Sequence, residues 1–185
     1  IRKDYGSKSV TIQNITQAYA ESSKGNGFIE EFIFRPEDRE RITLYGTIGD
    51  NMHTDLHECL GHGSGQLAPG VKGDELKQYG SVLEEARADL FSLYYMADPK
   101  MEELGLLPDA EVAKAQYASY ISNGMMTQLA RVELGKDIEQ THMRNRKMIS
   151  EWAYELGRRE NVIEKVVNDR KTYIVVNDFD KLRTL

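Results

Sequence analysis

The chain has 185 residues, a formal net charge of -6 and a single cysteine, Cys59. This length can bury one ordinary core, and because no Pro- or Gly-rich linker divides it, we expect residues 1–185 to form a single unit. The acidic balance and the lack of a Lys/Arg cluster argue against nucleic acid or an anionic membrane as a partner. A lone cysteine excludes an internal disulfide and favours a reducing compartment.

The sequence has no apolar run long enough to cross a bilayer, and its start, IRKDYGSKSV, lacks the apolar core of a signal peptide. The first residue is Ile1 rather than Met. We therefore expect the chain to be a piece of a longer protein, in which a targeting signal or another domain can lie outside these residues.

The N-terminal third predicts three helical stretches and one strand. Residues 9–23 carry apolar side chains at roughly helical spacing, which indicates a short surface helix. Residues 28–34, FIEEFIF, are aromatic and β-branched at their ends and predict a strand. Pro36 is typical of the first turn of a helix, and residues 50–62 again have a helical pattern that ends at a Gly-Ser-Gly segment.

A Gly-rich loop is expected over residues 66–80, followed by the clearest helix of the chain over residues 81–97. Ser81 at its start and Glu84 three residues later match a capping box. Apolar residues at spacings of three and four then form one broad face, so this segment is predicted to be a capped amphipathic helix.

The remaining sequence predicts two long helices, over about residues 109–133 and 138–157, and one strand over residues 172–176, TYIVV. There is no internal repeat and no low-complexity tract. The fold class expected for the whole chain is mainly α with minor β.

A catalytic zinc ion needs three protein ligands of the His or carboxylate type, one open position for water, and a nearby base. The segment HECLGH and the later segment EEARAD offer all of these. His57 and His62 are the predicted imidazole ligands and Glu85 the predicted carboxylate ligand. Glu58, beside His57, is the predicted general base, because zinc lowers the pKa of a bound water to about 7 and a carboxylate can then take its proton.

The two histidines are five residues apart, whereas the familiar zinc helix has the spacing HExxH. At about 100° per residue, five steps turn the second imidazole roughly 140° from the first, so a regular α-helix could not aim both at one ion. A π-type bulge adds one residue to a turn, and a glycine lowers the cost of the distortion. We therefore predict a bulged or unwound turn across Cys59, Leu60 and Gly61.

Two more carboxylates are predicted to support the imidazoles. Asp89 lies four residues after Glu85, on the same face of the helix, and can accept a hydrogen bond from a metal-bound imidazole. Glu84 can do the same for the other histidine. Two rival ligands are weaker: His53 is followed by Thr54 where a glutamate is expected, so we interpret it as solvated or structural, and Cys59 is interpreted as a packed thiol.

HECLGH with EEARAD resembles the paired HEXXGH and EEXXAD-type motifs of the dipeptidyl peptidase III family, peptidase family M49. GHGSGQL after the first motif and THMRNR around His142 are similar to the family as well. The resemblance extends from about His53 to beyond Arg146. One departure is Cys59, where a leucine is common, and this change leaves the ligands intact.

The resemblance implies a cytoplasmic zinc exopeptidase that releases dipeptides from the N-terminus of short peptides. It implies that His142 contacts the substrate carbonyl, with Arg146 near the same cleft. Family members are longer and have two lobes, so the chain is expected to be a fragment of the helical zinc lobe without its partner lobe, able to bind zinc and still be inactive. Two alternatives stay open, namely a broader zinc aminopeptidase or endopeptidase, and a metal-free helical interaction domain.

Overall fold

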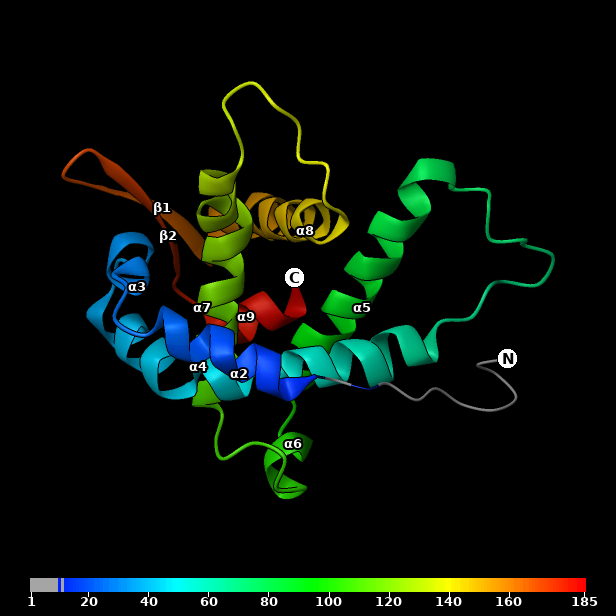
Figure 1. Cartoon of the computed structure of the whole chain (residues 1–185), viewed down its shortest axis with the longest axis horizontal. Helices are drawn as coiled ribbons and strands as arrows, with labels where there is room; N and C mark the ends of the chain where they lie inside the picture. Colours follow the sequence, from blue (N-terminus) through cyan, green and yellow to red (C-terminus); the bar gives the residue numbers. More distant parts are fainter. Residues whose placement is uncertain (1–9, 11) are drawn as a thin grey trace.

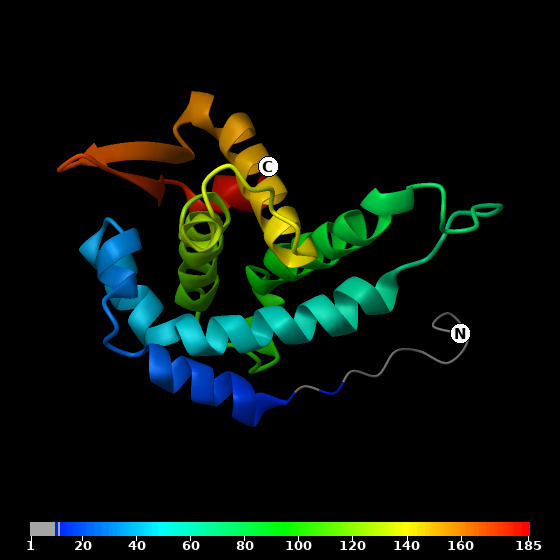
Figure 2. The ribbon, with the colours of Figure 1, turned by 45° about the horizontal axis from the view of Figure 1, so that its top comes forward.

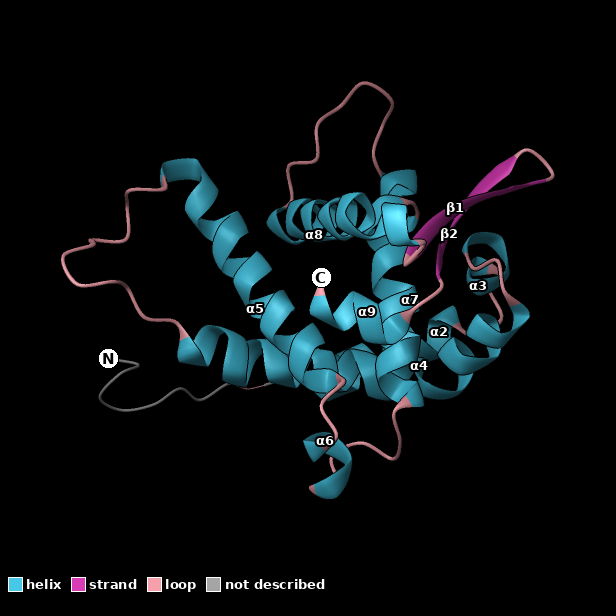
Figure 3. Cartoon of the chain, turned by 180° about the vertical axis from the view of Figure 1, so that it is seen from behind, coloured by secondary structure: helices cyan, strands magenta, loops and turns pink. Residues whose placement is uncertain are grey.

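The computed structural model describes residue 10 and residues 12–185. The fold is mainly α with one small two-stranded sheet, which confirms the predicted class (Figures 1 and 3). The α-helices are α2 (Gln13–Ser23), α3 (Phe28–Phe32), α4 (Pro36–Leu56), α5 (Gly80–Met96), α6 (Lys100–Glu103), α7 (Glu111–Met125), α8 (Thr141–Gly157) and α9 (Phe179–Thr184). The shorter turns are the π-helix η1 (His57–His62) and the 3-10 helices η2 (Lys77–Tyr79), η3 (Thr127–Arg131) and η4 (Arg158–Glu160).

The long helix α4 packs against several of the other helices. It packs against α7 and against α5, while α8 packs against both α5 and α7. Figure 2 shows α4 in cyan along one side of the molecule, with α2 outside it and α5, α7 and α8 on the opposite side. The π-helix η1 continues α4 and lies against α5. The two predicted metal-binding segments are therefore brought together by the packing of α4 and η1 on α5.

Two apolar clusters hold this arrangement, because removing apolar surface from water is the main favourable term in folding. The larger cluster joins α5, α7 and α8 to the sheet. The smaller cluster joins the ends of α4 and α5 to α6 and to the start of α7. Their buried members are Ala86, Tyr120, Ile121, Met125, Ile149, Val162, Ile163, Ile174 and Val176 in the first, and Leu56, Met96, Met101, Leu107, Val112 and Ala113 in the second.

The sheet is an antiparallel hairpin of β1 (Ile163–Asn168) and β2 (Lys171–Val176), with Ile163 paired to Val176. Both residues of its tight turn, Asp169 and Arg170, have positive φ, as this kind of hairpin turn requires. The strand expected over residues 172–176 is confirmed. Its partner was not predicted, because half of the residues in β1 are polar and its apolar residues do not alternate with them.

The strand predicted over residues 28–34 is wrong, because Phe28–Phe32 form helix α3. Glu30 and Glu31 lie in its first turn, where negative charge stabilises the positive end of the helix. The apolar ends of this segment suggested a half-buried strand. None of the residues in α3 is buried, so no buried strand face is needed here.

The boundaries of other helices also differ from the expectation. The helix expected over residues 9–23 begins at Gln13, and residue 9 lies outside the described residues. The two stretches that begin at Pro36 and at residue 50 join in the single helix α4, which ends at Leu56 and continues as η1. The short helices α6 and α9 were not predicted. The stretch 109–133 is divided, because α7 ends at Met125 and a 3-10 turn follows.

Helix α5 confirms the predicted helix over residues 81–97 but not its cap. The helix begins at Gly80 after Tyr79, and no side chain caps it. The capping-box interpretation of Ser81 and Glu84 is therefore wrong, because the carboxylate of Glu84 is engaged elsewhere. In the part of the chain that the structure describes, every helix is too short or too polar to span a bilayer.

Candidate metal centre

The segment HECLGH forms a π-helix, His57–His62, which confirms the predicted distortion of the turn. The backbone N–H of Gly63 donates to the carbonyl oxygen of Glu58, five residues earlier, as in a π-turn. The wider turn brings the imidazoles of His57 and His62 to the same side, with ring centroids 4.6 Å apart and planes nearly perpendicular.

Gly61 sets the distance between the π-helix and α5. A Cβ atom at this position would lie 2.7 Å from both the Cα and the Cβ of Ala88, closer than any stable contact allows. Ala88 is itself fully buried in α5. Only glycine therefore permits η1 to approach the part of α5 that carries the carboxylates, in addition to easing the distortion for which it was predicted.

The predicted ligands His57, His62 and Glu85 are brought together, and one nitrogen or oxygen atom from each lies within 4.8 Å of the others. Oε2 of Glu85 is 3.1 Å from Nε2 of His57 and 3.6 Å from Nε2 of His62. This oxygen is buried, and it makes no hydrogen bond with any residue that the structure describes. A buried carboxylate oxygen facing imidazole nitrogens without a hydrogen bond is expected where a cation binds.

The geometry of this group fits a zinc ion. Ligand atoms bound tetrahedrally at about 2.0–2.1 Å lie about 3.3–3.4 Å from one another. The separations of 3.1 and 3.6 Å on Glu85 bracket this value. Two imidazoles and one carboxylate are also a ligand set of catalytic zinc, which keeps a fourth position open.

Asp89 accepts four hydrogen bonds in the interior of the protein. Its Oδ1 accepts from Nδ1 of His57 at 2.7 Å and from Nε2 of His53 at 2.9 Å. Its Oδ2 accepts from the hydroxyl of Tyr120 at 2.7 Å and from the amide of Asn145 at 3.0 Å. Because the carboxylate can only accept, His57 donates through Nδ1 and directs the lone pair of Nε2 toward Glu85.

These contacts shift the pKa values of both partners. Burial alone would raise the pKa of Asp89, but the hydrogen bonds from His53 and His57 hold it well below its usual value. Burial lowers the pKa of His57, and the hydrogen bond and negative charge of Asp89 outweigh that effect and raise it. The charges of Glu85 and Glu58 act in the same direction.

Glu84 supports the second imidazole near the surface. Its Oε1 accepts a hydrogen bond from Nδ1 of His62 at 2.9 Å. The guanidinium of Arg87 donates to both oxygens of Glu84, at 2.7 and 2.9 Å, and to the carbonyl oxygen of Gly61 at 2.8 Å. Chiefly because of Arg87, and also of His62, the pKa of Glu84 is lowered to about 2. The Glu84 side chain is 40% exposed, so water and salt screen this pair.

A second group of metal-binding residue types consists of His53, His57 and Asp89. It fits a metal ion less well, because both imidazoles already donate to the same oxygen of Asp89 at 2.7 and 2.9 Å. These are hydrogen-bond distances, shorter than the spacing of zinc ligands. His53 is buried, as a structural histidine, rather than solvated.

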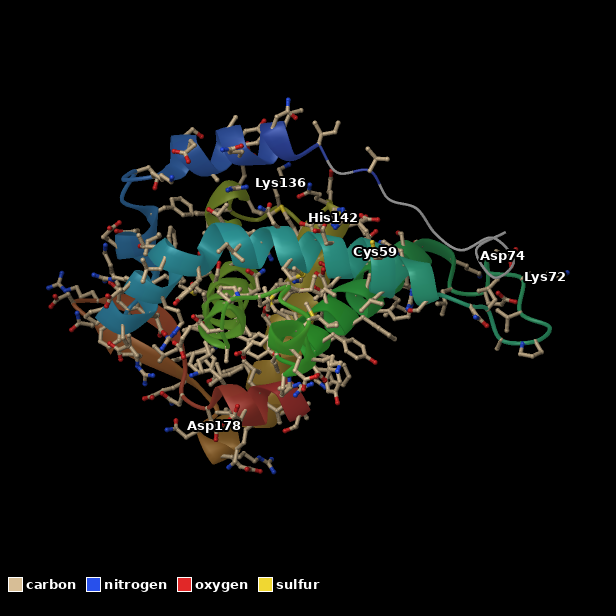
Figure 4. All side chains as sticks on the ribbon, turned by 90° about the horizontal axis from the view of Figure 1, so that it is seen from below. Cys59, Lys72, Asp74, Lys136, His142 and Asp178 are labelled. Atoms are coloured by element: carbon tan, nitrogen blue, oxygen red, sulfur yellow. The ribbon has the colours of Figure 1, made fainter. Side chains whose placement is uncertain are left out.

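The remaining predicted residues lie around the group. Glu58 follows His57 in η1 and is half-buried. His142 lies in the first turn of α8, is exposed, and has its Nδ1 3.3 Å from Oε2 of Glu85. Cys59 is exposed, so its interpretation as a packed thiol is wrong: the π-turn directs this side chain outward (Figure 4).

The partners of Asp89 other than His57 were not identified from the sequence. His53 had a signal, since it precedes His57 by one helical turn, but it was interpreted only as a rival ligand. Tyr120 comes from α7, and nothing in its sequence context distinguishes it from other core residues. Asn145 comes from α8 and lies in the THMRNR segment, but there the resemblance pointed to His142 and Arg146.

The three ligand types are those of a metal-dependent hydrolase, and a comparison with known families supports a metallopeptidase. Residues 1–75 match the model of peptidase family M49. This match supports the M49 family, the family of dipeptidyl peptidase III. The matched segment contains His57 and His62 but ends before Glu85, which the fold brings to them. No curated protein matches the chain.

Proposed function

We propose that the chain carries the zinc site of a dipeptidyl peptidase III-type exopeptidase, which releases dipeptides from the N-terminus of short peptides. The observation that supports this proposal most strongly is the group of His57, His62 and Glu85, in which a buried Glu85 oxygen makes no hydrogen bond with the described residues. The M49 match over the segment that contains both histidines supports the same assignment.

When bound, zinc would polarise the peptide carbonyl and lower the pKa of the attacking water to about 7. In the proposed mechanism, the carboxylate of Glu58 accepts the proton of this water and passes it to the leaving amine. His142, exposed on the first turn of α8, donates a hydrogen bond to the substrate carbonyl oxygen as negative charge develops there. Asp89 and Glu84 hold the imidazoles of His57 and His62 in place.

The proposal includes a second lobe. The resemblance to longer, two-lobed peptidases implies that peptides bind between this helical unit and a partner lobe of the same protein, in the cytoplasm. The chain by itself is then expected to bind zinc without cleaving peptides, because part of the substrate-binding surface lies outside it.

Metal analysis of the purified chain tests the metal site directly. We expect about one zinc per chain after zinc supplementation. Glu85→Ala should lose the metal, because it removes a ligand, whereas Glu58→Ala should retain it. Less than about 0.1 zinc per chain in the wild type would favour a metal-free interaction domain. Equal zinc retention in both variants would contradict the roles assigned to Glu85 and Glu58.

The cleavage specificity is tested on the full-length parent protein with dipeptidyl-naphthylamides and single-residue amides. Release of dipeptides, abolished by Glu58→Ala with zinc retained, is the expected result. Release of single residues, or cleavage within longer peptides, would show a broader aminopeptidase or endopeptidase instead.

A further inference from the structure

Asp89 is enclosed by three side chains besides His57, from three different helices. His53 comes from α4, Tyr120 from α7 and Asn145 from α8, and we call these three residues the Asp89 cage. All three are buried, with exposed fractions of 6%, 3% and 0%. An ionised carboxylate offers about four acceptor positions, and the cage occupies three of them.

The cage determines which position remains for His57. With two donors on Oδ2 and one on Oδ1, the remaining acceptor position lies on Oδ1, 2.7 Å from Nδ1 of His57. A carboxylate that had lost one cage donor could rotate or accept a different donor. The direction of the His57 ring, and so of its Nε2 toward Glu85, therefore depends on the cage.

Two residues of the cage, His53 and Tyr120, line a polar cavity that Asp89 itself does not line. This cavity of about 210 Å³ is bordered by His53, Tyr120, Asp50 and Arg146 among other polar residues. It is large and polar enough for water, which would compete for the acceptor positions of Asp89 if a cage donor were removed.

We propose that the residues of the Asp89 cage are positioning residues for the metal centre. They act through Asp89 on His57, and none of them touches the metal or the substrate. This inference rests on the proposed zinc site and extends it to side chains from two helices, α7 and α8, that carry none of the proposed metal ligands.

Two tyrosines on α7 provide a matched test. The hydroxyl of Tyr120 donates to Asp89, and that of Tyr117 donates to the backbone carbonyl of Leu93, both at 2.7 Å. The two side chains are similarly buried, at 3% and 5%. Replacing either with phenylalanine removes one buried hydrogen bond and leaves the ring, so a purely structural role would make the two variants alike.

The experiment measures the zinc dissociation constant of the 185-residue chain by competition with a chromophoric chelator, together with the visible spectrum of the cobalt-substituted chain. Tyr120→Phe is expected to weaken zinc binding about tenfold and to alter the cobalt spectrum, as loss of an outer support does. Tyr117→Phe is expected to keep the affinity within about twofold and the spectrum unchanged.

A second pair of variants covers the α4 side of the cage. His53→Gln offers an amide donor near the place of Nε2 and should retain most of the affinity, whereas His53→Leu should lose it. Equal zinc affinity in Tyr120→Phe and the wild type, or equal losses in the two tyrosine variants, would overturn the proposal. A wild-type chain that binds no zinc would instead refute the proposed function itself.

Discussion

The two imidazoles of the centre are supported in opposite ways. His57 is held by Asp89, a buried carboxylate. The other donors to Asp89 are a histidine on α4, a tyrosine on α7 and an asparagine on α8. His62 is held by Glu84, a half-exposed carboxylate whose charge is balanced by Arg87. The first support is part of the core, and the second is a surface ion pair.

The difference indicates how each support responds to change. Removing one partner from a buried charged network leaves donors without acceptors, which is costly, whereas a surface ion pair contributes little to folding. Both carboxylates nevertheless orient an imidazole, so both should affect metal affinity. Stability and zinc binding should therefore separate on the Glu84 side and change together on the Asp89 side.

The largest effect is expected from Asp89→Asn. One acceptor oxygen becomes an NH₂ group, and two buried donors lose their partner. We expect zinc affinity to fall about 100-fold and the free energy of unfolding of the zinc-free chain to fall by about 3–5 kcal/mol. Urea unfolding and chelator competition measure the two quantities. The control is Asp98→Asn, which changes a carboxylate that is paired with Arg183 nearer the surface. If Asp89→Asn lost as little zinc affinity and stability as Asp98→Asn, the comparison would be refuted.

Gly61→Ala should disturb both supports, because a methyl group there meets the backbone of Ala88 at 2.7 Å. Forcing η1 away from α5 should cost about 1–3 kcal/mol and separate the imidazoles from Glu85. Gly46→Ala on α4 is the matched control, since its Cβ would meet only Ile42 at 3.5 Å and alanine is the better helix former. Thermal unfolding and zinc titration of both variants test this prediction. Retention of full zinc affinity by Gly61→Ala would contradict the packing argument.

Glu84→Gln should reduce zinc affinity about tenfold while changing the free energy of unfolding by less than about 1 kcal/mol. The same two measurements apply, with Glu103→Gln, which disrupts an exposed pair with Lys100, as the control for loss of a surface ion pair. If Glu84→Gln destabilised the chain as strongly as Asp89→Asn, the contrast between the two supports would be wrong.

The smallest effect concerns pH. The pKa of Glu84 is about 2 in the folded chain, below its usual 4.5, so its contribution to stability is present above about pH 4.5 and is lost as the pH falls toward 2. The stability difference between the wild type and Glu84→Gln should therefore shrink over this range, and also at high salt. Asp89, with a lower pKa, should keep its contribution to lower pH. Urea unfolding of the zinc-free chain at several pH values tests this, and a pH-independent difference would contradict it.

The sequence was sufficient where a local constraint carried the information. The five-residue spacing of His57 and His62 cannot be reconciled with a regular helix, so it predicted the π-turn. The spacing of Glu85 and Asp89 placed both on one face of the helix α5. In each case the geometry of a single helix decided the outcome.

Sequence reasoning failed where partners come from distant segments. Ser81 and Glu84 have the spacing of a capping box, yet His62 and Arg87 engage Glu84, because charged partners in the fold outweigh a local cap. Tyr120 and Asn145 meet Asp89 only through the packing of α7 and α8 on α5, which no local pattern records.

The most direct test of the metal centre is diffraction from crystals of the zinc-loaded chain at the zinc absorption edge. The expected anomalous peak marks a zinc ion that lies about 2.0–2.2 Å from Nε2 of His57, Nε2 of His62 and a carboxylate oxygen of Glu85. A peak beside His53 and Asp89, or no peak within bonding distance of Glu85, would contradict the assignment.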